Sequence, residues 1–307
     1  MRTTILKAVR LAVLTALVLP GLTGAPADAQ TTLRWRLQKG ETLYYTMTQK
    51  SMIKQSASGK SFEVTMTQTF DTTWKVGDAS EDSAEVTQTF DRIRMSVDAP
   101  TGKLEYDSKD GKVPEGQFGQ QFGATISAIV GAGITFKING RGEVSDVKLP
   151  DKLLETIKSV AGAGTGSPMS EEALKKLIKE STFPLPEKPV TPGTTWSKNT
   201  EVAAPPSGSM ILKNTYTYKG PVTEGGKKLE RIDVTTITEL VPADTTQLKA
   251  TIKSQDAKGS FLFDNAKGHI DHSTMTQKME TVFTMMNIES TQITDITATM
   301  TLGKPAN

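Results

Sequence analysis

Cysteine is absent from this 307-residue chain. The absence excludes disulfides, thiolate nucleophiles and thiolate-bound metals, so the fold must be stabilised by its core alone. Ala25 stands where an acylated cysteine would follow Leu-Thr-Gly, so we expect no lipidation. Histidine is scarce: His269 and His272 lie three apart at the start of a predicted strand. Strand side chains at that spacing point to opposite faces, so we expect no shared metal.

An excess of either charge is also missing. The first 29 residues hold three of the 36 basic and one of the 34 acidic residues, which leaves 33 of each in the rest of the chain. Its net charge is therefore zero, and a basic surface for nucleic acid has no support in the composition. We expect no nucleic-acid partner.

Long apolar runs are missing apart from Leu11–Leu19 near the N-terminus. Arg2, Lys7 and Arg10 lie before or beside this run, and Ala27-Asp28-Ala29 follows it as a small-x-small cleavage signal. The order predicts a signal peptide over residues 1–29, and the run has about half the roughly 20 residues of a membrane span. We expect export by the general secretory route to the periplasm or the exterior, as a soluble protein without a transmembrane segment after processing.

Catalytic motifs are weak or absent. Ser51–Lys54 and Ser145–Lys148 match Ser-x-x-Lys in strand-like contexts, whereas the acylated serine of that motif begins a helix. Gly162–Gly166 follows a helix, which indicates a linker and not a phosphate loop. Asp264–Gly268 lacks the acidic spacing of a calcium loop and indicates a hairpin turn. We predict no cofactor and no metal, while a carboxylate pair assembled from distant positions stays open.

Threonine is abundant instead, with 44 residues that fall in alternating runs. Such runs favour half-buried antiparallel strands. In the clearest run, the apolar side chains share one face: Phe62, Val64, Met66, Phe70, Trp74 and Val76. Further strands are predicted at Leu33–Gln38, Leu43–Met52, Ala84–Val97, Ile134–Asn139, Glu143–Lys148, Ile211–Lys219, Leu229–Leu240, Gln247–Ser254, Ser260–Asp264, His269–Met286 and Ile288–Leu302. A phase slip within Ala84–Val97 predicts a β-bulge near Asp91-Arg92.

The middle of the chain has a different pattern. Helices are predicted near Phe118–Gly131, at Pro150–Ala161 and at Pro168–Glu180, with Gly162–Ser167 as a flexible link. A proline-rich crossing segment follows. We therefore predict an α+β, mostly β fold: one large curved antiparallel sheet of roughly ten or more strands, with two or three short helices packed on one face. Residues 30–307 form a single β-rich domain, whose helical and proline-rich middle segment covers residues 116–196.

Three stretches resemble a family of exported bacterial proteins of unknown function. Ile134–Val147 is a strand, a glycine-containing turn and a strand, and a short helix follows it. Phe183–Trp196 is a proline-rich segment that ends in Gly-x-x-Trp, and Leu33–Glu41 fits the family's first strand and turn. The family carries no established catalytic residues. The predicted architecture is also similar to lipoprotein-carrier-like half-barrels, an analogy of fold that does not establish function.

Methionine gives the only functional indication. Met275, Met279 and Phe283 share a face of one predicted strand, and Met66, Phe70 and Trp74 share a face of another. Pliable thioethers suit a surface that binds varied apolar ligands, although core filling explains the same pattern. We predict a non-enzymatic binding or interaction protein of the cell envelope, with an apolar ligand or an envelope protein as partner. The alternatives are a structural envelope module with a filled core and a hydrolase built from distant residues.

Overall fold

The computed structural model describes residues 30–112, 123, 126–161, 170–204, 208–243, 248–286 and 288–304. The predicted signal peptide over 1–29 and the link Gly162–Ser167 lie outside these residues, as does most of Phe118–Gly131. Residues 126–129 of that last stretch are helical.

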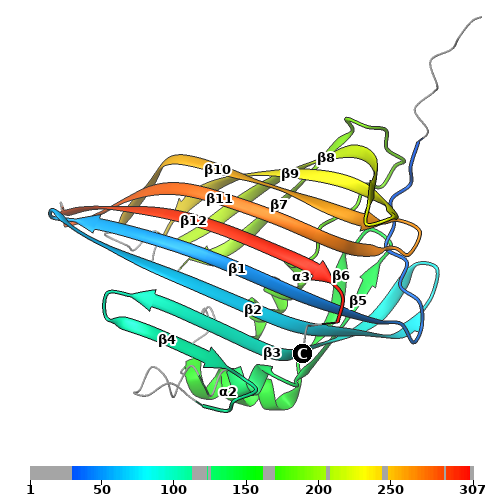
Figure 1. The fold of residues 1–307 in the computed structure, drawn as a ribbon, viewed down its shortest axis with the longest axis horizontal. Helices are drawn as coiled ribbons and strands as arrows, with labels where there is room; N and C mark the ends of the chain where they lie inside the picture. The colour runs from blue at the N-terminus through cyan, green and yellow to red at the C-terminus, as the bar shows by residue number, and fades with distance from the viewer. Residues whose placement is uncertain are drawn as a thin grey trace, which may run out of the picture.

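Twelve strands of the described chain form one open antiparallel sheet, which confirms the predicted fold class (Figure 1). The strand order is β6-β5-β3-β2-β1-β12-β11-β10-β9-β8-β7, and β4 pairs with β3 beside this path. The strands are β1 Thr42–Ala57, β2 Lys60–Ala79, β3 Ser83–Ala99, β4 Gly102–Asp107, β5 Gly133–Asn139, β6 Val144–Lys148, β7 Thr195–Ala204, β8 Gly208–Glu224, β9 Lys227–Pro242, β10 Lys249–Asp264, β11 His269–Met285 and β12 Ile288–Leu302. The two helices with defined bounds are α2 Asp151–Ala161 and α3 Glu171–Glu180.

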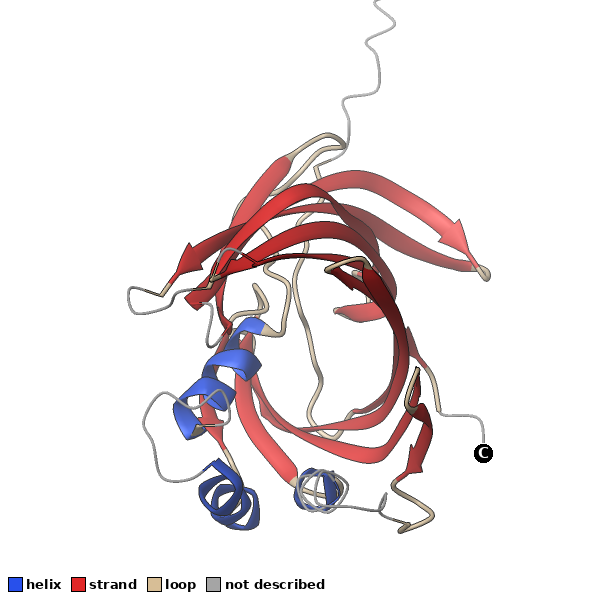
Figure 2. Ribbon diagram, turned by 90° about the vertical axis from the view of Figure 1, so that its left-hand side faces the viewer, coloured by secondary structure: helices blue, strands red, loops and turns tan. Residues whose placement is uncertain are grey.

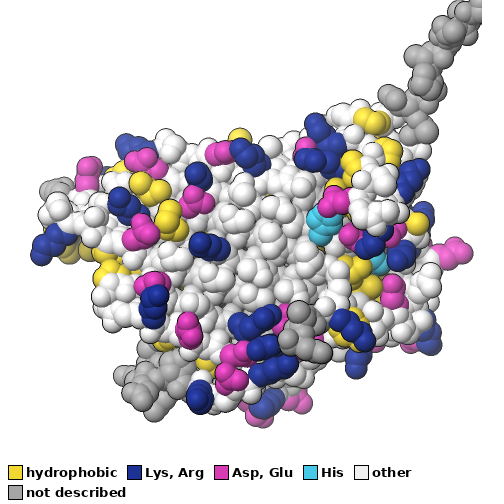
Figure 3. Space-filling view, in the orientation of Figure 1, with side chains coloured by type: hydrophobic (Ala, Val, Ile, Leu, Met, Phe, Trp, Pro, Cys, Tyr) yellow, Lys and Arg dark blue, Asp and Glu magenta, His cyan; other side chains and the backbone are white. Residues whose placement is uncertain are grey.

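The sheet is strongly curved, with one concave and one convex face. In the view of Figure 2 it curls around an interior that loops cross, with the helices along one side. Side chains alternate between the two faces along each strand. Rows of threonine, such as Thr274, Thr299, Thr48 and Thr69 on adjacent strands, take convex positions. The centre of the surface over β1 and β12 is accordingly mostly uncharged, and charged side chains lie mainly around it (Figure 3).

The phase slip predicted in β3 is confirmed. Asp71 of β2 pairs with Arg92, and the next residue, Thr72, pairs with Phe90. Asp91 is therefore the extra residue of a β-bulge, and its carboxylate accepts a hydrogen bond from the Thr73 hydroxyl. The bulge keeps the apolar residues on both sides of it on the concave face.

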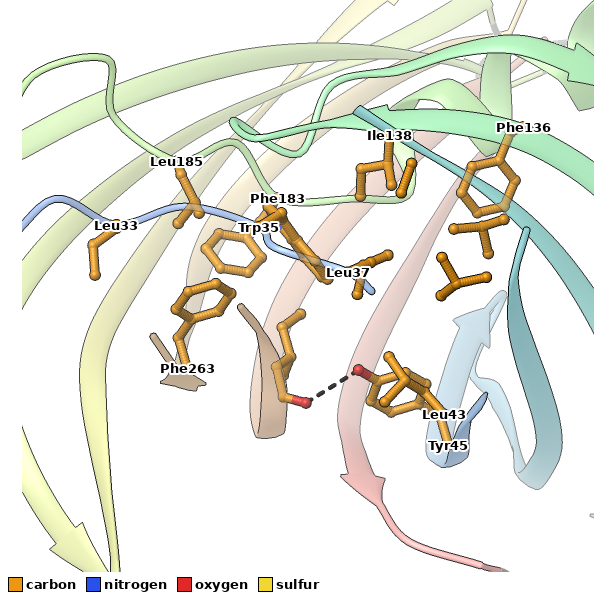
Figure 4. Packing of buried hydrophobic residues seen from close by; sticks show 14 of the residues in the cluster. Leu33, Trp35, Leu37, Leu43, Tyr45, Phe136, Ile138, Phe183, Leu185 and Phe263 are labelled. Atoms are coloured by element: carbon orange, nitrogen blue, oxygen red, sulfur yellow. Dashed lines mark hydrogen bonds between the residues drawn. The ribbon is translucent and has the colours of Figure 1, made fainter. Parts of the chain in front are cut away.

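The main core lies on the concave side and includes the N-terminal segment. Leu33, Trp35 and Leu37 are buried there against Phe183 and Phe263 (Figure 4). The rings of Trp35 and Phe263 meet edge to face, with centroids 5.7 Å apart. Figure 4 also shows the hydrogen bond of 3.1 Å from the Tyr45 hydroxyl to the carbonyl of Ile270.

The predicted strand Leu33–Gln38 is wrong. The backbone N–H of Trp35 donates to the carbonyl of Gly140, and that of Arg36 donates to the carbonyl of Gly268. Both acceptors lie in turns at the ends of strand pairs, not in a neighbouring strand. The apolar and polar residues alternate because the extended segment lies across the core, and a period of two does not distinguish that arrangement from a sheet strand.

Other boundaries also differ from prediction. The predicted strands Gln247–Ser254 and Ser260–Asp264 form one strand, β10, which has a register irregularity between residues 252 and 254. The structure adds β4 and β7, which the sequence analysis did not predict. Each of them pairs with a single strand of the described sheet, β4 with β3 and β7 with β8.

Helix α2 begins where Pro150 was predicted to open a helix, and α3 begins at Glu171, after the N-cap Ser170. The Ser170 hydroxyl accepts a hydrogen bond from the backbone N–H of Ala173, which is why α3 starts three residues later than predicted. Of the helices that the structure describes, none is long and apolar enough to cross a bilayer.

An ion pair across the β3–β4 hairpin gives a first prediction. The hydrogen bond from Arg92 lowers the pKa of the Asp107 carboxyl to about 2, against its ordinary 3.8. A lowered folded-state pKa stabilises the fold above the unfolded pKa, and this stabilisation is lost as the pH falls from about 4 to about 2. Asp107→Asn is therefore expected to lower the free energy of unfolding by about 1 kcal/mol at neutral pH and to have no effect near pH 2. Urea unfolding at both pH values measures the difference, with the exposed Asp110→Asn as control. An equal loss at both pH values would contradict the assignment.

Candidate functional site

A cavity of about 360 Å³ lies between α3 and the concave face of the sheet. Its wall comes from the central strands, α3, the N-terminal segment and the residues just after α3. The lining side chains are Trp35, Tyr45, Met47, Phe70, Thr72, Trp74, Gln88, Phe90, Ile134, Leu174, Leu177, Ile178, Ser181, Thr182, Ile270 and Met300. Largely apolar, partly open cavities of this size are typical of small-molecule sites.

The strand register explains why these residues converge. Met47 of β1 pairs with Phe70 of β2 on one side and with Met300 of β12 on the other. On β2, the next inward residue after Phe70 is Thr72, which pairs with Phe90 of β3. The inward residue after that is Trp74, which pairs with Gln88 of β3. Alternate positions on four adjacent strands therefore present one continuous surface to the cavity.

Helix α3 covers the cavity without being buried itself. Leu174 and Ile178 pack against the core, whereas Leu177 is 58% exposed and no residue of α3 is fully buried. A second cavity, of about 210 Å³, lies between α3 and β7 and shares Leu174 and Leu177 with the first. The helix thus rests on the sheet through one apolar stripe with space on both sides.

Ion pairs hold α3 to the edge strand β7. The carboxylate of Glu180 lies 2.8 Å from Nζ of Lys198, and that of Glu201 lies 3.7 Å from Nζ of Lys176. Such partly exposed pairs contribute little, on the order of 1 kcal/mol or less each. The cover of the cavity is therefore fixed less firmly than the strands beneath it.

Among the residues that the structure describes, no Asp, Glu, Lys, Arg or His belongs to the cavity wall. The Tyr45 hydroxyl is buried, and burial raises the pKa of Tyr45 above its ordinary value, so the phenol stays neutral. The indole N–H groups of Trp35 and Trp74 are buried without an acceptor among the described residues. A wall of this composition can hold an uncharged, largely apolar molecule.

The predicted apolar site residues divide into two groups. Phe70 and Trp74 line the cavity. Met66 lies on the same face of β2, four residues before Phe70, and Met275, Met279 and Phe283 lie on the concave face of β11 outside the cavity wall. All six share the concave face, but the structure brings only two of them to the cavity.

The sequence analysis missed Met47, Phe90 and Met300 as site residues. Met47 lies on the same face of β1 as Leu43 and Tyr45, so the alternation of the sequence could have predicted which face it is on. Its place beside the cavity depends on β1 pairing with β12, two strands far apart in the sequence. The helix at Pro168–Glu180 was predicted, but not the strands that α3 covers.

The two histidines do not form a joint site. His269 is buried, with Nε2 4.0 Å from the Glu41 carboxylate, whereas Nε2 of His272 lies 3.3 Å from the Glu224 carboxylate. In the part of the chain that the structure describes, no group of three or more His, Asp or Glu side chains is placed to bind a metal ion.

Comparisons with known proteins identify a family and several distant structural likenesses. Residues 81–270 match the model of a family of unknown function, DUF6263. The sequence has no significant match among curated proteins.

Among solved structures, the chain is similar to lipovitellin, in a structure of lipid-protein interactions, with 13% identity and a TM-score of 0.46. The match covers 89% of this chain and 26% of the lipovitellin chain, so the chain spans about a quarter of that relative. It is also similar to DynF of the dynemicin biosynthesis pathway of Micromonospora chersina, with 8% identity, a TM-score of 0.22, and 93% and 92% of the two chains covered. The COG4313 outer membrane channel from Pseudomonas putida F1 has 6% identity, a TM-score of 0.25, and 91% and 99% coverage. At these values the likenesses concern the backbone alone, and none of them assigns a ligand or an activity.

Proposed function

This chain belongs to DUF6263, a family of unknown function, and we propose that it is a non-enzymatic binding protein that holds an apolar ligand between α3 and the concave face of the sheet. The observation that carries the proposal is the cavity of about 360 Å³ with its uncharged, largely aromatic and aliphatic wall. Removing hydrocarbon from water into such a space is favourable by about 25 cal/mol for each Å² of apolar surface buried.

The position of α3 supports reversible binding. The cavity is partly open, and its least firmly held neighbour is α3, which has no fully buried residue. Movement of α3 away from Phe70 and Trp74 opens the cavity without breaking any strand pairing. Elements of low local stability are the ones that gate binding sites.

The two alternative functions have less support. A structural module with a filled core has no need of a cavity beneath a lightly packed helix. A hydrolase needs an acid and a base at the bound molecule, and none of the wall residues that the structure describes is Asp, Glu, Lys, Arg or His. The N-terminal features described above support an envelope or extracellular location, which is part of this proposal.

Tryptophan fluorescence tests the proposal directly, because Trp35 and Trp74 line the cavity and Trp196 does not. A dibrominated monoacylglycerol, whose bromines quench indoles on contact, is expected to quench the fluorescence of the full chain in a saturable way. Trp74→Phe is expected to remove a large part of that quenching, and Trp196→Phe to leave it almost intact. The proposal fails if quenching is absent, or if it depends on Trp196 and not on Trp74.

A further inference from the structure

The concave surface continues beyond the cavity and remains free of charge. The inward positions run from Leu43 to Gln55 on β1, from Phe62 to Val76 on β2, from Ser273 to Met285 on β11 and from Ile288 to Leu302 on β12. None of them is Asp, Glu, Lys, Arg or His. Every charged residue within these four ranges takes a convex position. Over these ranges, the concave surface of the four strands is therefore free of charge, and all of their charged side chains lie on the convex side.

Glutamines supply the amide groups of this concave surface. Gln49 and Gln68 face each other on β1 and β2, as the inward pair directly next to the Met47–Phe70 pair of the cavity wall. The spacing of inward neighbours along a strand is about 7 Å, so the two amides lie at the margin of the cavity. Gln277 of β11 adds a third amide nearby, opposite Ile296.

Two of these amides have poor hydrogen-bond partners within the described chain. Nε2 of Gln68 donates to the thioether sulfur of Met95, and Nε2 of Gln277 donates to that of Met279, each over 3.9 Å. Both side chains are half-buried. A thioether is a weak acceptor, so an ester or hydroxyl oxygen of a ligand is a better partner for either N–H.

We propose that the ligand is an uncharged lipid whose hydrocarbon chain fills the cavity and whose ester or hydroxyl oxygen lies against Gln49 and Gln68. This inference rests on the proposed function and adds the class of ligand. An ionised carboxylate on this surface loses its hydration and finds no cationic partner. The Gln49 amide already donates to the Ser51 hydroxyl, 3.2 Å away, whereas a pure hydrocarbon leaves the Gln68 amide with the thioether of Met95 as its acceptor.

Three probes with one chain length separate these possibilities: methyl oleate, oleate and octadecene, delivered from cyclodextrin complexes at pH 9. Affinities for the full chain are measured by tryptophan fluorescence. Methyl oleate is expected to bind about tenfold more tightly than oleate and about fivefold more tightly than octadecene. Gln68→Leu is expected to lower the affinity for methyl oleate to that for octadecene and to leave octadecene binding unchanged, which excludes a folding defect.

The matched charge variants are Gln68→Glu and Thr67→Glu, adjacent residues on opposite faces of β2. Gln68→Glu is expected to weaken methyl oleate binding at least about tenfold, and Thr67→Glu to leave it unchanged. If oleate binds as tightly as methyl oleate, or if methyl oleate binds no better than octadecene, the inference about the ligand class is wrong while the proposed function stands. If none of the three probes binds, the proposed function itself is wrong.

Discussion

Phe263→Ala is expected to lower the free energy of unfolding by about 3–5 kcal/mol. Phe263 is fully buried, and its ring meets Trp35 and Phe183 edge to face, with centroids 5.7 Å and 6.2 Å away. Truncation removes the transfer free energy of the ring and leaves a hole between the sheet, the N-terminal segment and the proline-rich crossing segment. Since this core joins parts of the chain that are distant in sequence, relaxation of the backbone cannot fill the hole cheaply.

Phe62→Ala is the matched control for this prediction. Phe62 also faces inward on a strand, but it lies near the end of β2 and is 48% exposed. The expected loss is below about 1 kcal/mol, since little of its surface leaves water on folding. Urea unfolding of both variants decides the matter. Similar losses would mean that the core does not lie where the structure has it.

Phe70→Asp is expected to reduce the affinity for an uncharged lipid at least about a hundredfold, because it places a carboxylate in the wall of the apolar cavity. Thr67→Asp introduces the same charge on the convex face of the same strand and should leave binding intact. Phe70→Asp is also expected to cost several kcal/mol of stability, and Thr67→Asp far less.

The loss of affinity in Phe70→Asp should depend on pH. Desolvation in the cavity disfavours the ionised carboxyl and raises its pKa. The neutral acid predominates below that raised pKa, so binding is expected to recover in part as the pH falls from 8 to 5. Binding that stays absent at pH 5 in a folded variant would show that the effect of the substitution is not electrostatic.

The central sheet was predictable because its strands carry strict alternation. Phe62–Val76 has its apolar residues on one face in the structure as in the sequence pattern, and even the bulge at Asp91 was apparent from a change of phase. The same periodicity gave a false strand at Leu33–Gln38, where the alternation reflects an extended segment across the core. Periodicity reports which side chains are buried, not what the backbone pairs with.

The candidate site was only partly predictable. Phe70 and Trp74 were identified through their face, but the cavity depends on contacts between distant segments. Met47 and Met300 become neighbours only because β1 pairs with β12, and Leu174 reaches them only because α3 lies over the concave face. Glutamines such as Gln68 were not among the predicted site residues. Their proposed role as partners of a ligand oxygen depends on the uncharged concave surface around them, which is formed by several strands together.

Native mass spectrometry tests the central claim most directly, that the concave face holds an uncharged apolar ligand. The full chain and its Phe70→Asp and Thr67→Asp variants are each mixed with 1-oleoylglycerol at neutral pH and transferred to the gas phase under gentle conditions. The account predicts one bound lipid per chain for the unsubstituted protein and for Thr67→Asp, and none for folded Phe70→Asp. Lipid-free spectra for all three proteins, or equal lipid binding by all three, would contradict it.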